Sequence, residues 1–182
     1  MAISGKFDKR LILDRIISGL ELAKQAAMSA AKQAHETATH SETVAKSKYE
    51  TFGLEASYLA HGQAQRVAEC NIELLAYKSL NLACFSDDII IDLSALVTIE
   101  DEQGAVKTCF IGPGAGGMKI DIKLDTDIDT GAIKHGDPKL GHIIVITPSS
   151  PLGQILMGKL VYDSVQLTIG GALKHYEIIS VS

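Results

Sequence analysis

The chain has no tryptophan, and only nine of its 182 residues are tyrosine or phenylalanine. This shortage argues against a deep aromatic pocket for a nucleobase or a drug-sized ligand. The net charge of −5 argues against a protein that works by wrapping nucleic acid, because such binding depends on many contacts of Lys and Arg with phosphate. No apolar run approaches the roughly 20 residues that span a bilayer, and the first residues lack the layout of a signal peptide. We therefore expect a cytoplasmic protein with no membrane partner.

Residues that would carry intrinsic catalysis or bind a metal are also scarce. The three cysteines, Cys70, Cys84 and Cys109, lie far apart and form no CxxC pair, which favours reduced thiols. The six histidines have no HExxH or other ligand spacing, and no Ser, Cys or Thr stands in the context of a nucleophile. We expect no intrinsic catalytic residue, no permanently bound metal and no cofactor of the chain's own.

Two segments resemble binding motifs without fitting them. Residues 112–117 satisfy G-x-G-x-x-G, but the following MKIDIKL predicts a strand rather than a phosphate-binding helix. Residues 125–131 resemble a calcium loop, but the glycine comes one position late and position twelve is Gly136 rather than Glu. We interpret residues 125–140 as a solvated acidic loop.

Composition changes near residue 84, which predicts two separately built domains, 1–83 and 84–182. Residues 1–83 contain no proline and four of the sixteen glycines, and their net charge is +1. The remainder holds all four prolines, is richer in β-branched residues and has a net charge of −6.

The first domain has the periodicity of two long helices. Apolar residues follow a 3–4 spacing that keeps one stripe against a partner helix. In the first helix the stripe comprises Leu13, Ile16, Leu20, Ala23, Ala27, Ala30 and Ala34. In the second it comprises Ala56, Ala60, Val67, Cys70, Leu74 and Tyr77, interrupted by Gln63. The simplest structure is an antiparallel coiled-coil hairpin, slender because most of the seam is alanine.

The sequence leaves two places for the turn of this hairpin. One is at residues 39–41, where Ser41 could cap the second helix. The other is at residues 51–53, where Gly53 supplies backbone freedom. The balance of arm lengths favours the first, which keeps Gly53 inside a helix.

The second domain alternates in twos, which predicts strands. We expect strands at residues 91–100, 106–111, 119–124 and 142–147, then a short helix that Ser150 caps and Pro151 begins. Gly158 ends that helix, and a hairpin of residues 165–169 and 175–181 closes the domain. The predicted class is α+β, with a small antiparallel sheet and one short helix.

The order of these domains, with several local motifs, resembles the Gre family (GreA and GreB) of bacterial transcription elongation factors. TPSSPLGQILMGKLVYDSVQL resembles the family's Ser-Pro helix and Val-x-Asp-x-Val run, and GGALKHYEI resembles its closing hairpin. LVTIEDEQGAVKTCFIGPG resembles its first β-hairpin, and LEASYLAHGQAQR resembles the stretch after the coiled-coil tip, with Tyr58 on the family tyrosine. Together these matches extend over roughly residues 8–181.

The resemblance implies a monomeric binding protein rather than an enzyme. An FKBP-like C-terminal domain would dock on the β′ subunit of bacterial RNA polymerase at the secondary channel. The coiled coil would then reach the active centre, where tip carboxylates help to hold a shared Mg²⁺ so that the polymerase cleaves the 3′ end of its backtracked RNA. The alternative within the family is a channel-occupying inhibitor or modulator; alternatives of other classes are an FKBP-like prolyl isomerase and a coiled-coil adaptor.

The chain departs from the Gre pattern at the tip. The family has an Asp and a Glu three residues apart, and alignment on Tyr58 places Thr51 and Leu54 there. The neighbouring Glu50 and Glu55 are the candidate tip carboxylates, with Glu36 and Glu42 in reserve; solvated surface acids are the alternative. On one continuous helix, Glu50 and Glu55 would lie about 140° apart and could not grip one ion.

The docking segment is predicted at Ser149, Ser150 and Pro151. In relatives this segment contacts the polymerase, and the residue that is often acidic there is Ser149 here. Plain helix capping is the alternative role. Further on, Tyr162 replaces the family glycine that precedes an aspartate.

Overall fold

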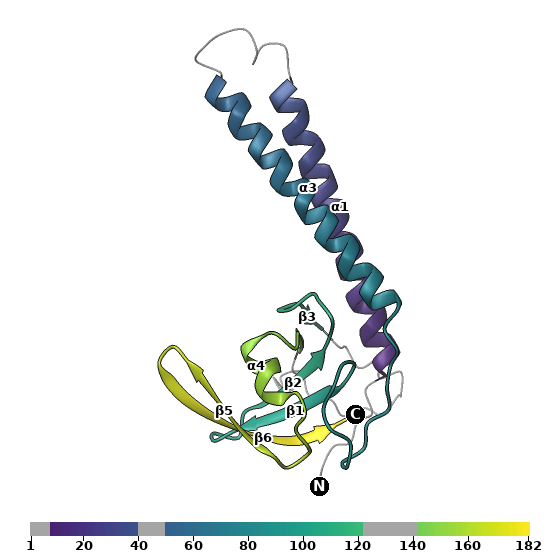
Figure 1. The fold of residues 1–182 in the computed structure, drawn as a ribbon, viewed down its shortest axis with the longest axis vertical. Helices are drawn as coiled ribbons and strands as arrows, with labels where there is room; N and C mark the ends of the chain where they lie inside the picture. Colours follow the sequence, from purple (N-terminus) through teal and green to yellow (C-terminus); the bar gives the residue numbers. More distant parts are fainter. Residues whose placement is uncertain (1–7, 40–49, 122–141) are drawn as a thin grey trace, which may run out of the picture. The chain divides into compact units, whose positions relative to one another are not determined.

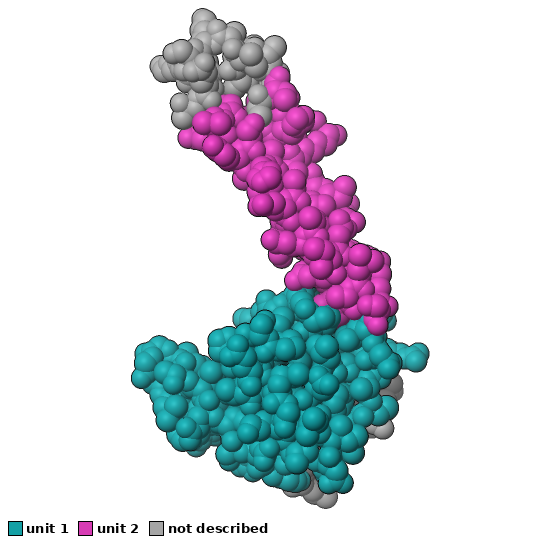
Figure 2. All heavy atoms as spheres, viewed as in Figure 1, with its two compact units in different colours: residues 1–16, 80–182 teal, residues 17–79 magenta. Residues whose placement is uncertain are grey.

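A computed structural model describes residues 8–39, 50–121 and 142–182. The chain forms two compact units, one of residues 17–79 and one of residues 1–16 together with 80–182 (Figure 2). The predicted acidic loop at 125–140 lies outside the described residues. No described helix is both long and apolar enough to cross a membrane. The predicted functional division at residue 84 stays a prediction.

The helical unit is an antiparallel hairpin of α1 (Lys9–Thr39) and α3 (Glu50–Lys78), which lie side by side in Figure 1. An ion pair of 3.4 Å joins Glu21, in the first half of α1, to Lys78, the last residue of α3. The predicted seam is confirmed in the side chains that the hairpin buries, which are Leu20, Ala27, Ala34, Ala56, Cys70, Leu74 and Tyr77. At the start of α1, in the other unit, Ile12 is buried while Leu13 is half-buried.

The end of the hairpin formed by the last turn of α1 and the first turn of α3 is called here the distal end. Because α1 ends at Thr39 and α3 begins at Glu50, the connection lies between these residues. The alternative turn at residues 51–53 is therefore wrong, since α3 runs through Gly53. Hydrogen bonding along the helix outweighs the modest cost of a glycine within it. Ser41, the predicted cap, lies outside the described residues.

The other unit contains a six-stranded sheet with the order β3-β4-β2-β1-β6-β5. Its strands are β1 (Leu96–Asp101), β2 (Val106–Ile111), β3 (Lys119–Ile120), β4 (Ile143–Ile146), β5 (Ser164–Ile169) and β6 (Ala172–Val181). A short helix, α4 (Pro151–Leu156), follows β4. The core of the unit is formed by Ile91, Val97, Ile99, Cys109, Ile111, Leu156, Val165 and Ile178, among others.

Two details of the sheet differ from the sequence prediction. The sheet is mixed rather than wholly antiparallel, because β2 and β4 pair in parallel. Alternation does not encode strand direction, which depends on the path of the chain between the two strands. In addition, β1 begins at Leu96 rather than at residue 91. A turn precedes it, in which Ser94 has a φ of +69° and the N–H of Ala95 donates to the carbonyl of Asp92 at 3.1 Å.

Local hydrogen bonds shape the tight turn between β1 and β2. The Asp101 carboxylate accepts from the backbone N–H groups of Ala105 at 2.9 Å and Gln103 at 3.0 Å. These bonds, that from Ala105 above all, lower the pKa of Asp101. The turn at Gly170–Gly171, which joins β5 to β6, has a positive φ at both residues, as a tight two-residue hairpin turn of type I′ requires.

A lysine ties the start of α1 to the segment that follows α3. Lys9 Nζ donates to the Ala83 carbonyl at 2.8 Å and lies 4.5 Å from the centre of the Phe85 ring. Partial burial lowers the pKa of Lys9 to about 8, against a smaller opposing effect of Cys84. The exposed thiol is that of Cys84, while Cys70 and Cys109 are buried and all three are free, as the sequence predicted. Burial raises the pKa of Cys109 to about 11.

Two glycines predict opposite effects of the same substitution. A Cβ at Gly153 would lie 2.0 Å from the Thr147 carbonyl oxygen, whereas a Cβ at Gly62 in α3 would meet nothing within 4 Å. Gly153→Ala should therefore lower the free energy of unfolding by about 2–3 kcal/mol. Gly62→Ala should raise it by about 0.5–1 kcal/mol, because alanine restricts the unfolded chain and favours the helix. Denaturant unfolding of the two variants measures both free energies of unfolding. Equal changes in the two variants would contradict the close contact of Gly153 with the Thr147 carbonyl.

Candidate functional site

Three of the four candidate tip acids can be placed at the distal end of the hairpin or in the next turn of α3. Glu36 lies one turn before the end of α1, and its carboxylate is 3.9 Å from Lys32 Nζ, with both side chains exposed. Glu50 is the first residue of α3, and Glu55, which is exposed, follows in the second turn. Glu42 lies outside the described residues.

The continuity of α3 separates the first candidate pair. Glu50 and Glu55 would converge only if the chain turned between them, and α3 is helical across that interval. Five residues of an α-helix correspond to about 140° of rotation. The backbone therefore directs these two positions to different sides of α3, and the pair does not form a single two-carboxylate site.

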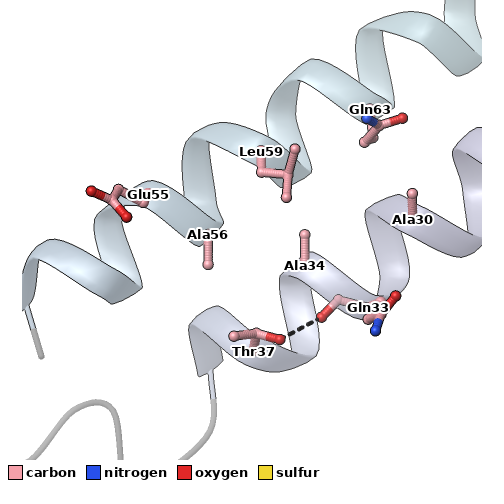
Figure 3. A pocket seen from close by; sticks show the side chains of 8 residues that line it. All are labelled: Ala30, Gln33, Ala34, Thr37, Glu55, Ala56, Leu59 and Gln63. Atoms are coloured by element: carbon pink, nitrogen blue, oxygen red, sulfur yellow. Dashed lines mark hydrogen bonds between the residues drawn. The ribbon is translucent and has the colours of Figure 1, made fainter.

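A shallow groove of about 450 Å³ lies between α1 and α3 toward the distal end (Figure 3). Its floor consists of small side chains, because Ala34 of α1 and Ala56 of α3 point toward each other and leave space beside them. Thr37 closes one side and donates a hydrogen bond to the Gln33 carbonyl at 2.9 Å. The full lining is Ala30, Gln33, Ala34, Thr37, Glu55, Ala56, Leu59 and Gln63. The groove follows from the alanine seam and holds no cluster of catalytic groups.

The second predicted site, the start of α4, is built around Ser150. The Ser150 hydroxyl donates to the Thr147 carbonyl at 2.7 Å and accepts from the N–H of Gly153 at 3.1 Å. Ser150 is thus the N-cap of α4, and Pro151 stands in its first turn. Because the hydroxyl both donates and accepts a hydrogen bond within the turn, Ser150 stabilises the conformation of the chain at the start of α4.

The residues on either side of Ser150 are exposed. Pro151 presents its ring to solvent at the start of α4. The Ser149 hydroxyl lies 3.1 Å from that of Thr147, and the Ser149 carbonyl accepts from the Gln154 side chain at 3.1 Å. The structure therefore brings the three predicted docking residues together as one hydrogen-bonded corner with Ser149 and Pro151 facing solvent.

Sequence reasoning did not identify the turn at Leu160–Asp163 as a candidate site. There the N–H of Asp163 donates to the Leu160 carbonyl at 3.2 Å, and the N–H of Leu160 donates to the Asp163 carboxylate at 2.9 Å. Tyr162, third in the turn, has a φ of +71°. The signal in the sequence was the tyrosine at a position where the resembled family has glycine.

The described aromatic residues of this unit differ in exposure. Phe110 and Tyr176 are buried, Phe85 is half-buried and Tyr162 is exposed. Within residues 8–39, 50–121 and 142–182, no group of three or more His, Cys, Asp or Glu side chains is arranged to hold a metal ion.

The capping role of Ser150 can be separated from its neighbour's role. Ser150→Ala should cost about 1 kcal/mol of stability, because the N–H of Gly153 loses its acceptor. Ser149→Ala is the matched control, and its effect should stay within about 0.5 kcal/mol because its hydroxyl is exposed. Chemical denaturation compares the two; a larger loss at Ser149 would show that the cap has been misassigned.

No protein-family model matches the sequence, and neither does any curated protein. Among solved structures, GreA factor homolog 1 (Gfh1) of Thermus thermophilus matches at 16% identity over 97% of this chain and 96% of its own, with a TM-score of 0.34. Gfh1 of Thermus aquaticus matches at 18% identity over 92% of both chains, with a TM-score of 0.34. GreA/GreB from Nitrosomonas europaea matches at 13% identity over 71% of this chain and 92% of its own, with a TM-score of 0.33. Similarity at this level does not identify the function of the chain.

Proposed function

We propose that the chain is a bacterial RNA polymerase-binding transcription elongation factor. Its C-terminal domain docks on the β′ subunit at the secondary channel, and its helical hairpin enters the channel and modulates elongation. The factor acts as a monomer, without a cofactor of its own, beside the Mg²⁺ of the polymerase and the 3′ end of backtracked RNA. The proposal rests on the sequence resemblance of both domains to the Gre family and on the form of the hairpin.

The hairpin is the observation that supports this role best. The 29 residues of α3 extend for about 44 Å at 1.5 Å per residue. The alanines at the contact of α1 and α3 keep the pair narrow, since helices with small contact residues approach closely. A long and narrow rod buries too little to enclose a substrate, but it can deliver the residues of its distal end into a channel.

Two functions of the distal end are compatible with the proposal. Cleavage of backtracked RNA needs carboxylates that hold a second Mg²⁺, and a displacement of about 1 Å can cost roughly 100-fold in rate. Occupation of the channel needs only the rod. The continuity of α3 across Gly53 favours occupation, because Glu50 and Glu55 then lie on different sides of the helix.

Binding to core RNA polymerase tests the docking part. Pro151→Glu should weaken binding by roughly tenfold, because it places a charge at the centre of the exposed corner. Gln103→Glu is the control; it adds the same charge at the exposed turn between β1 and β2 and should bind like the unmodified chain. Circular dichroism should show the same helix content for all three proteins. Unchanged affinity of Pro151→Glu would remove the Ser149–Pro151 corner from the docking surface.

The distal end is tested by the length of the RNA in backtracked polymerase complexes at fixed Mg²⁺. We expect slowed elongation without shortening of the RNA 3′ end. Shortening that is lost in Glu50→Ala or Glu55→Ala, with binding retained, would contradict this and assign these two acids. Shortening that is lost in Glu36→Ala or Glu42→Ala would assign the reserve pair. Glu21→Ala is the control on the same hairpin, because Glu21 pairs with Lys78 away from the distal end.

The purified chain can also be tested for the two functions of other classes, a coiled-coil adaptor and a prolyl isomerase. A coiled-coil adaptor that pairs through its helices would be a dimer in sedimentation or size-exclusion mass measurements, whereas the self-paired hairpin is expected to be monomeric. A prolyl isomerase would accelerate cis–trans exchange of a proline peptide, an activity for which the scattered positions of Phe85, Phe110, Tyr162 and Tyr176 offer no support.

A further inference from the structure

The turn at Leu160–Asp163 holds an exposed aromatic residue in a conformation that disfavours it. Tyr162 is the third residue of this turn, where a positive φ favours glycine or asparagine. Its Cβ crowds the following carbonyl in this region of the backbone map. The sheet imposes the conformation, since the N–H of Tyr162 donates to the Ile178 carbonyl at 2.7 Å and the N–H of Ile178 donates to the Asp163 carbonyl at 3.0 Å.

The side chain of Tyr162 is largely outside the packed part of the fold. It is 71% exposed, and no hydrogen bond or ring contact of its phenol is found among the residues that the structure describes. Elsewhere in this unit positive φ is mostly assigned to glycine, as at Gly158, Gly170 and Gly171. The fold requires the positive φ but not a tyrosine there, and a strained residue of this kind motivates a hypothesis of function.

Further apolar side chains are exposed on the segment that leads into this turn and on a second segment that is hydrogen-bonded to it. The N–H of Ile91 donates to the Lys159 carbonyl at 2.8 Å, and the N–H of Gly158 donates to the Ile91 carbonyl at 2.9 Å. These bonds hold residues 89–93 beside residues 158–162. The exposed members, called here the Tyr162 patch, are Ile89 (43%), Ile90 (55%), Leu93 (37%), Leu160 (37%) and Tyr162 (71%).

The charges on the same segments indicate which surface chemistry would be complementary. Asp87, Asp88 and Asp92 are exposed along the stretch that carries the isoleucines, and the nearby cation of the second segment is Lys159. A patch of this kind is complementary to an apolar recess bordered by basic side chains. Aromatic side chains are the most common anchors of such protein interfaces, because they bury a large area with few rotatable bonds.

We infer that the Tyr162 patch is a docking surface for RNA polymerase, with the Tyr162 ring as the anchor that enters an apolar, basic-bordered recess of the polymerase. The inference rests on the proposed function and adds a second contact to the Ser149–Pro151 corner. The strained turn then presents the ring outward, and the acidic rim speeds association.

Three substitutions of Tyr162 separate the ring from the backbone strain. Tyr162→Asn removes the ring and suits a positive φ, Tyr162→Ala removes the ring and keeps the strain, and Tyr162→Phe keeps the ring. Binding of each full-length variant to core RNA polymerase is measured by surface plasmon resonance at two salt concentrations, and each variant is also unfolded by heat. All variants are compared with the unmodified chain in the same buffer.

The expected result is a separation of affinity from stability. Tyr162→Asn and Tyr162→Ala should each bind at least tenfold more weakly, and Tyr162→Phe should bind within threefold of the unmodified chain. Tyr162→Asn should unfold at a higher temperature than Tyr162→Ala, and higher salt should slow association. Binding of all three variants like the unmodified chain would overturn the inference and leave the proposed function standing. No binding by the unmodified chain would overturn both, and a homodimer that Tyr162→Asn dissolves would replace the polymerase by a second copy.

Discussion

The close contact of α1 and α3 along an alanine-rich seam is the constraint on which the hairpin depends. Toward the distal end the buried seam residues are small, as Ala34 and Ala56 illustrate, and the helices enclose only a shallow groove. Toward the other end Leu20, Leu74 and Tyr77 are buried, so most of the apolar area that the hairpin buries lies there. Since burial stabilises in proportion to apolar area, the hairpin gains most of its stability away from the end that would work inside a channel.

This distribution relates stability to function. The distal end can stay narrow because large side chains elsewhere hold the pair together, and the ion pair of Glu21 with Lys78 adds little because both side chains are half exposed. Acidic residues on both helices then stand at a part of the hairpin that carries little of its packing. Substitutions there should change function more readily than they change folding.

Periodicity explains how much of the fold could be predicted from the sequence. The seams follow from a 3–4 spacing that is typical of a helix pair, whereas the place of the turn had to be chosen on the balance of arm lengths. Ser150 with Pro151 marks the start of α4 because capping is local chemistry. The parallel pairing of β2 with β4 was beyond reach, because alternation is the same in both directions. The turn at Ser94 was missed because its positive φ is imposed by contacts with distant residues, such as the bond to the Ile111 carbonyl.

The candidate site residues also differ in how far local sequence could place them. The predicted docking residues 149–151 are adjacent in sequence, so a short motif places them together, whereas the position of the candidate tip acids depends on where the chain turns. Glu50 and Glu55 looked like a pair only while a turn at Gly53 remained open. The conformation of Tyr162 shows the limit of pattern reasoning: the substitution was visible in the sequence, but the strain that gives it meaning appears only in the backbone.

In the proposed function, the distal end of the hairpin reaches the active centre of RNA polymerase. When Fe²⁺ replaces the catalytic Mg²⁺ of the polymerase and hydrogen peroxide is added, Fe²⁺ reduces the peroxide to hydroxide and a hydroxyl radical, which cuts any polypeptide held close to the metal. In a complex with core polymerase, this chain should then be cut between the end of α1 and the start of α3, at residues 39–50, and not in the strands. Cutting within residues 96–181, or no cutting of a chain that is demonstrably bound, would contradict this proposal.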